Sequence, residues 1–461
     1  MLTRIEIDGF KSFENFSLDL QPFTVIVGPN ATGKSNLFDA LRLLSRLADT
    51  EVRSAVQDQR GEPTELFRAL ANGQPELRLR LAVEVLLDRE VIDPYGKPHG
   101  LKGTRVRYEV EIELHHNERP GLKRLYVSRE EARLISHSGD PLFKEASTHR
   151  KRSLKKWAPS KGKPSELIKT ERIGNQFTLK VAQDGVQGRS RSLPFGEASA
   201  TFLSTVRAAD EFPHLFALRE ELIAFRFLQL NPTAARMPSD MLAGDILQPD
   251  GSNLAAVLAR IQAETSTGER PSGAVADIRA DLASLIPGIL GLEVERNEVA
   301  RQFQVFVEMR DQARFSSRVL SDGTLRVLAL LTLLHDPRRR GTLCFEEPEN
   351  GIHEARIGGL IEVLRSFCTD LDDEPTVGQK LSQIIVNTHS PVVMSDLEDH
   401  EIVAADTVLV SEPATNRRYR RTRMRTGVTS EMPLRSPEDR EHKLTRLELV
   451  DLLRRDPAPV T

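Results

Sequence analysis

Apolar residues gather in short runs at two widely separated places in this chain, and each run has the length of a buried strand or helix. The first run covers residues 23–27 and is followed, after a glycine-containing turn, by apolar residues at helical spacing over 36–44. A short β-branched run followed by a period of 3.6 residues predicts a strand that leads through a turn into a helix.

The second place begins near residue 320. Residues 327–334 are strongly apolar, and their composition and length predict a buried helix with Ser321 as its N-cap. Two further apolar runs, at 342–345 and 384–386, predict buried strands, and polar residues follow each of them directly. In parallel α/β sheets the carboxyl ends of the strands are where ligands bind.

Residues 49–317 separate these two places and contain two kinds of pattern. Runs of β type with partial alternation predict antiparallel strands at 76–87, 104–114, 123–129 and 177–181. After Ala200 the pattern becomes helical, with the clearest helices at 252–261 and 275–285 and a hairpin at 292–309.

The end of the chain predicts one more helix. Ser436 fits the N-cap position, and apolar residues follow at the spacing of an amphipathic helix: Leu444, Leu447, Val450 and Leu453. Such a helix either closes the second lobe or docks a partner.

Residues 28–35 match the phosphate-loop pattern G-x-x-x-x-G-K-[ST] in full. They are Gly28, Pro29, Asn30, Ala31, Thr32, Gly33, Lys34 and Ser35, and Asn36 follows them. The two glycines let the backbone turn its amide groups towards phosphate oxygens, and the following helix adds the positive end of its dipole. In this pattern Lys34 reaches the β and γ phosphates and the Ser35 hydroxyl is a ligand of Mg²⁺. We therefore expect residues 30–36 to surround ATP or GTP.

Two carboxylates, Glu346 and Glu347, directly follow the predicted strand at 342–345. Glu346 is placed to hold Mg²⁺, and Glu347 to accept a proton from an attacking water. His389 follows the next predicted strand. It is either a structural hydrogen-bonding residue or a sensor of the γ-phosphate, and its place after three other nucleotide-site segments favours the sensor.

Composition narrows the class of protein. A chain of 461 residues suggests two domains or one domain with a large insertion. The net charge of -3 gives no global attraction to nucleic acid or acidic membranes. The two cysteines, Cys344 and Cys368, exclude a disulfide framework. No apolar stretch approaches the roughly 20 residues of a membrane span, so we expect a cytoplasmic protein without membrane contact.

Four segments follow one another in a recognisable order. They are the phosphate loop, Leu-Ser-Asp-Gly-Thr at 320–324 (the signature segment), Glu-Glu-Pro-Glu-Asn-Gly at 346–351 and Asn-Thr-His-Ser-Pro at 387–391. This order resembles the ABC-type ATPases of the RecF, SMC, Rad50 and OLD group. Within that group the chain is most similar to the stand-alone ATPases of bacteria, including ATPase subunits of anti-phage systems such as Septu. ABC ATPases usually have Asp where this chain has Glu346, a departure that bears on Mg²⁺ geometry.

The resemblance implies an α/β fold: a P-loop NTPase of the ABC-ATPase head type, with an added antiparallel β region and a helical lobe. It implies Mg²⁺-dependent ATP hydrolysis in which Lys34, Glu347 and His389 take part. It also implies that the signature residues of one protomer cap the ATP held by the phosphate loop of another. These residues are Ser321, Asp322 and Gly323. We therefore expect a homodimer or a higher even oligomer.

This expectation divides the chain into five parts. They are 1–48 with the phosphate loop, 49–200 as a β-rich insertion, 201–317 as a helical lobe and hairpin, 318–400 as the rest of the ATPase, and 401–461 as a C-terminal hairpin and amphipathic helix. Gln229 has two interpretations. It either corresponds to the Mg²⁺-sensing glutamine of ABC enzymes or is a plain polar position in a strand.

Two basic segments are candidates for contact with DNA or RNA. The first runs from Arg150 to Lys163 and contains Trp157, the only tryptophan of the chain. The second runs from Arg417 to Arg425, contains Tyr419 and is expected to form part of a hairpin. Arginine and lysine bind the phosphate backbone, and aromatic rings stack on bases. A solvated surface is the alternative for each segment.

Three functions stay open at this stage. The first is an ATPase linked to nucleic acid, either the sensing subunit of an anti-phage system or a RecF-like repair ATPase. The second is an ABC-transporter subunit, against which the long insertion argues. The third is a scaffold that uses ATP without hydrolysing it. The chain has no sustained heptads, which argues against the long arms of SMC and Rad50 proteins. No Asp-x-Asp pair follows His389, so we expect any nuclease on a separate subunit.

Overall fold

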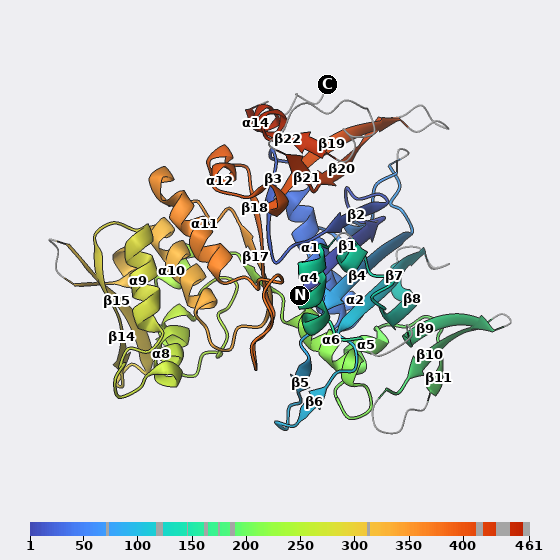
Figure 1. Ribbon diagram of the computed structural model, residues 1–461, viewed down its shortest axis with the longest axis horizontal. Helices are drawn as coiled ribbons and strands as arrows, with labels where there is room; N and C mark the ends of the chain where they lie inside the picture. The colour runs from blue at the N-terminus through green and yellow to red at the C-terminus, as the bar shows by residue number, and fades with distance from the viewer. Residues whose placement is uncertain are drawn as a thin grey trace.

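The computed structural model describes residues 1–461 except 71–72, 117–122, 145, 161–164, 174–175, 185–189, 311–313, 412–417, 430–442 and 455–461. The described residues gather around two large hydrophobic cores and a small one. The first core lies under a large antiparallel sheet, and the second lies among helices from the middle of the chain (Figure 1). A mainly parallel sheet stands between the two.

This central sheet has the strand order β12-β17-β18-β3-β19-β20. Its strands are β12 (Arg226–Leu228), β17 (Gly341–Glu346), β18 (Ser382–Thr388), β3 (Phe23–Val27), β19 (Ile402–Ser411) and β20 (Arg418–Arg425). β20 pairs antiparallel with β19, and the other pairs are parallel. Successive residues of β3, β17 and β18 enter the two large cores alternately, which explains their continuous apolar runs.

The second sheet is antiparallel, with the order β11-β10-β9-β8-β7-β4-β1-β2. Its strands are β1 (Leu2–Asp8), β2 (Phe16–Asp19), β4 (Arg78–Leu86), β7 (Arg105–His116), β8 (Lys123–Leu134), β9 (Glu166–Ile173), β10 (Gln176–Ala182) and β11 (Ser190–Pro194). The four strands expected between residues 76 and 181 are confirmed as β4, β7, β8 and β10. The sheet begins with the N-terminal strand, so the inserted strands extend a sheet that the first lobe already starts.

Helices pack against both large cores. The first core receives α1 (Lys34–Leu47), α2 (Val52–Gln57), α5 (Phe202–Thr205) and α6 (Pro213–Ile223). The second receives α8 (Leu254–Thr265), α9 (Val275–Leu285), α10 (Asp322–Leu334) and α11 (Ile357–Ser366). The expected helices at 252–261, 275–285 and 327–334 are thus confirmed. Residues 327–334 are all buried in α10, which explains why all of them except Thr332 are apolar.

Smaller elements complete the fold. The expected hairpin is confirmed as β14 (Ile289–Asn297) and β15 (Gln302–Met309), which pair antiparallel. The rest are α3 (Pro141–Lys144), α4 (Thr148–Trp157), α7 (Pro232–Ala235), α12 (Pro391–Ser395), β5 (Glu90–Ile92), β6 (Pro98–Gly100), β13 (Ser239–Asp240), β16 (Phe315–Ser316), β21 (Gly427–Thr429), β22 (Lys443–Thr445) and α14 (Arg446–Arg454).

The C-terminal helix begins later than the apolar spacing predicted. Ser436 lies outside the described residues, and the helix described there is α14. The prediction was wrong for Leu444, which lies in β22 instead. It was also wrong for Leu447, which is 79% exposed, whereas Leu449 of the same helix is fully buried. The helix packs on the second core through the buried Leu449 together with Val450 and Leu453 of the expected face.

A buried carboxylate, Glu130 of β8, joins the antiparallel sheet to α5. It accepts hydrogen bonds from the Tyr108 hydroxyl at 3.1 Å and from the backbone N–H groups of Phe202 at 2.6 Å and Leu203 at 3.0 Å. Burial raises the pKa of Glu130 to about 7, although the three hydrogen bonds lower it.

We expect Glu130 to make folding stability depend on pH. The pKa of a glutamate in an unfolded chain is about 4.3, below the folded value of about 7. The folded protein therefore holds this proton more tightly, and the contribution of Glu130 to the free energy of unfolding falls as the pH rises through this interval. Urea unfolding between about pH 5 and pH 8 should show a flatter profile for Glu130→Gln than for the wild type. Identical pH profiles would contradict this assignment.

Candidate functional site

The phosphate loop connects β3 to α1, and its backbone leaves the first turn of α1 open. Gly33 is the N-cap of α1 with a φ of 92°, and no side chain of the described residues caps this end of the helix. A Cβ on Gly33 would lie 2.1 Å from Oγ1 of Thr422, so glycine is required here. Asn30 and Ala31 are exposed at the tip of the loop. Uncapped N–H groups at the positive end of a helix dipole bind phosphate well.

Lys34 lies inside this loop and is buried. Its ammonium donates to the backbone oxygens of Gly28 at 2.6 Å and Pro29 at 2.7 Å. Burial lowers the pKa of Lys34 to about 8, although nearby carboxylates, chiefly Glu347, raise it. A buried ammonium whose hydrogen-bond partners are neutral carbonyls is stabilised by a bound anion, so the loop fits a phosphate group.

The carboxyl ends of β3, β17 and β18 bring the other predicted residues to the same edge. Glu346 ends β17, and its Oε2 accepts a hydrogen bond from Ser35 Oγ at 3.1 Å. Glu347 follows with a φ of 50°, and its N–H donates to the Asn387 backbone oxygen at 2.9 Å. Nδ1 of His389 lies 2.8 Å from Oε1 of Glu347. A hydroxyl, two carboxylates and an imidazole therefore meet beside Lys34.

Glu349 is a member of this cluster that the sequence analysis did not single out. Its side chain is buried, and its Oε1 accepts a hydrogen bond from the Thr388 hydroxyl. Its Oε2 has no hydrogen-bond partner among the residues that the structure describes. Burial raises the pKa of Glu349, and the hydrogen bond from Thr388 opposes this shift. Glu349 belongs to the Glu-Glu-Pro-Glu run at 346–349, but the strand pattern indicated only the first two carboxylates, which directly follow the predicted strand.

Arg60 also reaches the site without any sequence signal. It follows α2, and its guanidinium lies 3.4 Å from Oε1 of Glu346 and 3.9 Å from Oδ1 of Asp39. Glu346 therefore touches a hydroxyl on one side and a cation on the other. No periodic pattern in the sequence places residue 60 near residue 346, because the contact depends on how α2 packs.

The signature segment begins α10 in the other lobe. Ser321 is the N-cap, and its Oγ accepts from the Thr324 N–H at 3.1 Å, as predicted. Arg236 donates to the Leu320 backbone oxygen at 3.0 Å and pairs with Asp322. In the described part of the chain, no hydrogen bond joins residues 321–323 to the phosphate loop.

Gly323 rests directly on the loop that follows β17. A Cβ on Gly323 would lie 2.6 Å from Cα of Gly351, which itself has a φ of 92°. The start of α10 and the end of the Glu-Glu-Pro-Glu-Asn-Gly run are therefore in backbone contact. Neither position has room for a side chain.

Gln229 lies one residue beyond β12, so its interpretation as a position within a strand was wrong. It is exposed, and its N–H donates to the Pro249 backbone oxygen at 3.0 Å. The parallel register sets Leu228 opposite Phe345, which brings Gln229 to the sheet edge where Glu346 lies.

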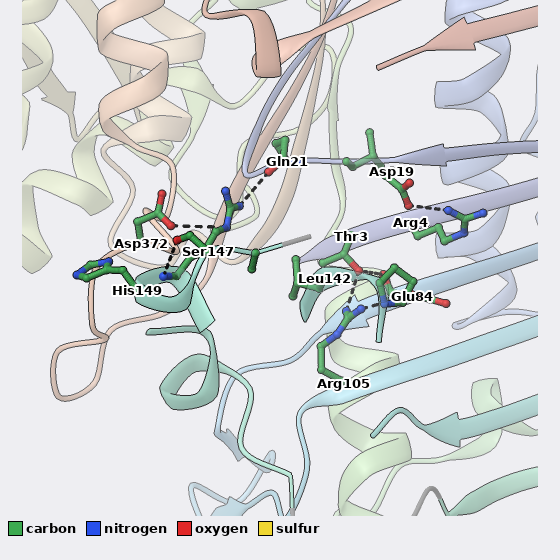
Figure 2. A pocket seen from close by; sticks show the side chains of 14 residues that line it. Thr3, Arg4, Asp19, Gln21, Glu84, Arg105, Leu142, Ser147, His149 and Asp372 are labelled. Atoms are coloured by element: carbon green, nitrogen blue, oxygen red, sulfur yellow. Dashed lines mark hydrogen bonds and ion pairs between the residues drawn. The ribbon is translucent and has the colours of Figure 1, made fainter. Parts of the chain in front are cut away.

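The first basic segment is a helix packed on the protein, and one expectation for it was wrong. Trp157 ends α4, is only 3% exposed and donates its indole N–H to the Asp373 backbone oxygen at 2.8 Å, so it cannot stack on bases. Arg150 lies 3.5 Å from Asp372 and donates to Gln21 at 3.4 Å, in a pocket of about 620 Å³ (Figure 2). Lys161 and Lys163 lie outside the described residues.

The second basic segment forms the edge strand β20 of the central sheet, in the expected hairpin with β19. Arg417 lies outside the described residues, and Arg418 and Arg420 are exposed. Arg423 and Arg425 pair with Asp406 at 2.6 Å and 2.7 Å. Asp406 therefore neutralises part of the positive charge of this strand, whereas Arg418 and Arg420 face solvent.

Two other features, a metal site built from protein side chains alone and a helix able to span a membrane, are absent from the described ranges. No group of three or more His, Cys, Asp and Glu side chains there is arranged to hold a metal ion. Ser35 and Glu346 supply oxygen ligands of the kind that Mg²⁺ takes together with phosphate groups. Among the described residues, no helix has the length and apolar character needed to cross a membrane.

Known proteins resemble this chain to different extents. The profile of the AAA_21 family, described as "AAA domain, putative AbiEii toxin, Type IV TA system", matches residues 23–395. Two curated sequences are similar over short stretches. The chromosome partition protein Smc of Methanocaldococcus jannaschii is 56% identical over 41 residues, and the structural maintenance of chromosomes protein 1 of Schizosaccharomyces pombe is 38% identical over 55 residues. These stretches are 9% and 12% of this chain, and each is 4% of the relative's length.

Solved structures with a partial likeness to this chain include heads of SMC proteins. An Smc head bound to the C-winged helix domain of ScpA has a TM-score of 0.47 at 14% identity, with 91% of this chain and 97% of that chain covered. The SMC head domain from Thermotoga maritima has a TM-score of 0.38 at 12% identity, with 94% and 99% covered. The family match spans both nucleotide-site segments and the insertion between them, so the chain belongs to the AAA_21 family.

Proposed function

We propose that this protein binds ATP with Mg²⁺ and hydrolyses it. The observation that carries the proposal is the meeting of Lys34, Glu346, Glu347 and His389 at one edge of the central sheet, next to an uncapped helix. The open N–H groups of α1 and the ammonium of Lys34 would hold the triphosphate. The Ser35 hydroxyl and Glu346 would hold Mg²⁺, which when bound neutralises charge on the phosphate oxygens.

Glu347 acts as the general base in this proposal. It accepts one proton from a water molecule, whose oxygen forms a bond to the γ-phosphorus while the bond from that phosphorus to the ADP oxygen breaks. Oε1 of Glu347 lies 2.8 Å from Nδ1 of His389, so this hydrogen bond orients the carboxylate. Asn350 Nδ2 donates to the other carboxylate oxygen at 2.7 Å. Both oxygens of the base are therefore held in place.

The active unit in the proposal is an even oligomer. The signature residues Ser321 to Gly323 lie in the other lobe from the phosphate loop, and their hydrogen bonds are made within that lobe. A second copy of the chain would bring its signature helix to the bound ATP, and by symmetry the first copy would do the same in return. The uncapped start of α1 and the N-terminus of α10 would then approach the triphosphate from two sides.

We expect Glu347→Gln to separate binding from hydrolysis. The amide keeps the shape of the side chain but cannot accept the proton, so kcat should fall by about 100-fold or more. The Kd for a fluorescent ATP analogue should stay within about twofold, because Glu347 does not bind the phosphates. Phosphate release and fluorescence titration measure the two quantities.

The matched control for this variant is Glu354→Gln. Glu354 is exposed and lies a few residues further along the same loop, in a short helical turn away from the site. It should hydrolyse ATP at the wild-type rate. A Glu347→Gln variant that also keeps the wild-type rate would remove Glu347 as the base.

The nucleotide state in turn controls contact with nucleic acid or with a separate nuclease subunit, in an anti-phage role. Support for the nucleic-acid part comes from the exposed Arg418 and Arg420 on β20, at the edge of the same sheet that holds the nucleotide site. The segment from Arg150 is the weaker candidate, because acidic residues of the 370–374 loop pair with Arg150 and Lys156.

Neutralising Arg418 and Arg420 together should weaken binding of a labelled single-stranded oligonucleotide. Each lost phosphate contact lowers the slope of log affinity against log salt by about 0.7 to 1. Fluorescence anisotropy across a potassium chloride series measures this slope. A double variant of two exposed arginines elsewhere, Arg53→Ala with Arg279→Ala, removes the same charge and should leave the slope unchanged. Equal slopes for both double variants would exclude β20 as the binding surface.

A further inference from the structure

A directed chain of hydrogen bonds closes around the outside of the phosphate loop. Asn36 Nδ2 donates to Ser12 Oγ at 2.9 Å, and Ser12 Oγ lies 2.7 Å from Oγ1 of Thr422. Thr422 Oγ1 donates to the backbone oxygen of Thr32 at 3.0 Å. A carbonyl can only accept and each hydroxyl has one proton, so the donors run in one direction, from Asn36 through Ser12 and Thr422 to Thr32.

Thr422 is held against the loop from two further directions. Its N–H donates to the Ser12 backbone oxygen at 3.0 Å, and its side chain is buried. It also occupies the space beside Gly33, where a Cβ would lie 2.1 Å from its Oγ1 and 3.0 Å from its Cγ2. One residue of β20 therefore contacts both sides of the peptide bond that joins Thr32 to Gly33.

The geometry of that peptide bond gives this contact a consequence. A trans peptide is planar, and its C=O and N–H point in opposite directions. Anchoring the Thr32 oxygen to Thr422 therefore fixes the direction of the Gly33 N–H, which points away from Thr422. Gly33 is the N-cap of α1, so its N–H is one of the donors at the uncapped end of the helix.

We propose that Thr422 is a positioning residue of the nucleotide site: its hydroxyl fixes the Thr32–Gly33 peptide so that the phosphate loop is formed before ATP binds. This inference rests on the proposed binding of ATP. It assigns a role to a threonine that lies almost 390 residues after the loop. The strand that contains it, β20, is rich in arginine, and its composition suggests only the binding of nucleic acid.

The test compares Thr422→Val with Thr422→Ser. Valine keeps the shape of threonine but removes the hydroxyl, whereas serine keeps the hydroxyl. The Kd for a fluorescent ATP analogue should rise about fivefold to tenfold in Thr422→Val, which corresponds to the loss of one hydrogen bond, and should stay within about twofold in Thr422→Ser. Thr407→Val is the matched control, because Thr407 pairs directly with Thr422 across β19 and β20 and is exposed.

A second readout uses the protein without nucleotide. Amide hydrogen exchange over residues 32–36 should be faster in Thr422→Val than in the wild type and in Thr407→Val. If Thr422→Val does not fold, as circular dichroism would show, Ser12→Ala breaks the same chain from another element and should accelerate exchange over the same residues. Wild-type exchange together with wild-type affinity in the folded variant would overturn the proposal. If the wild type binds no ATP, the proposed function fails, and the exchange rates still decide the role of Thr422.

Discussion

The parallel register of β3, β18 and β17 is the constraint on which the site depends. It sets Thr388 opposite Val27 and Glu346 opposite Asn387, so three chain segments leave the sheet at the same level. A shift of one residue in any of these pairings would turn the strand's apolar residues from one core to the other. The two cores on opposite faces of the sheet therefore fix the register, and the register fixes the site.

Two buried charged groups, Lys34 and Glu349, lie at this edge of the central sheet, and burial disfavours the charged form of each. Lys34 is buried with carbonyl oxygens as its hydrogen-bond partners, and burial lowers its pKa to about 8. Glu349 is buried with one carboxylate oxygen unpartnered, and burial raises its pKa. Both shifts are caused chiefly by burial, and among the described residues one oxygen of Glu349 also lacks a hydrogen-bond partner. Such an arrangement is typical of a site that is completed by a ligand, because the ligand supplies the missing partners.

Much of this arrangement could be predicted from local sequence, and the rest could not for identifiable reasons. The strand before Gly28, the helix after it, the N-cap at Ser321 and the strands before Glu346 and His389 follow from apolar runs and caps. The AAA_21 match confirms the family that these motifs resemble. Arg60 and Thr422 were missed because their contacts depend on how separate elements pack.

Two side chains are placed by tertiary contacts that local composition does not reveal. Trp157 suggested a stacking platform because it stands among basic residues, yet it fills the small core with Leu371 and Leu381. Leu444 matched a helical period and lies in a short strand, because a partner strand at 427–429 is available to it. In both cases a contact between segments distant in the sequence decided where the side chain lies, although the local pattern favoured another place.

The central claim is that each nucleotide site is completed by a second copy of the chain. The most direct measurement mixes two variants, Lys34→Ala and Ser321→Glu, and follows phosphate release. Each variant alone should be inactive, because one lacks the phosphate-binding lysine and the other places a negative charge where the signature meets ATP. In a random mixture, half of the dimers carry one intact composite site of two, so the account predicts about a quarter of the wild-type activity. A mixture as inactive as its components, or an active Ser321→Glu variant, would contradict it.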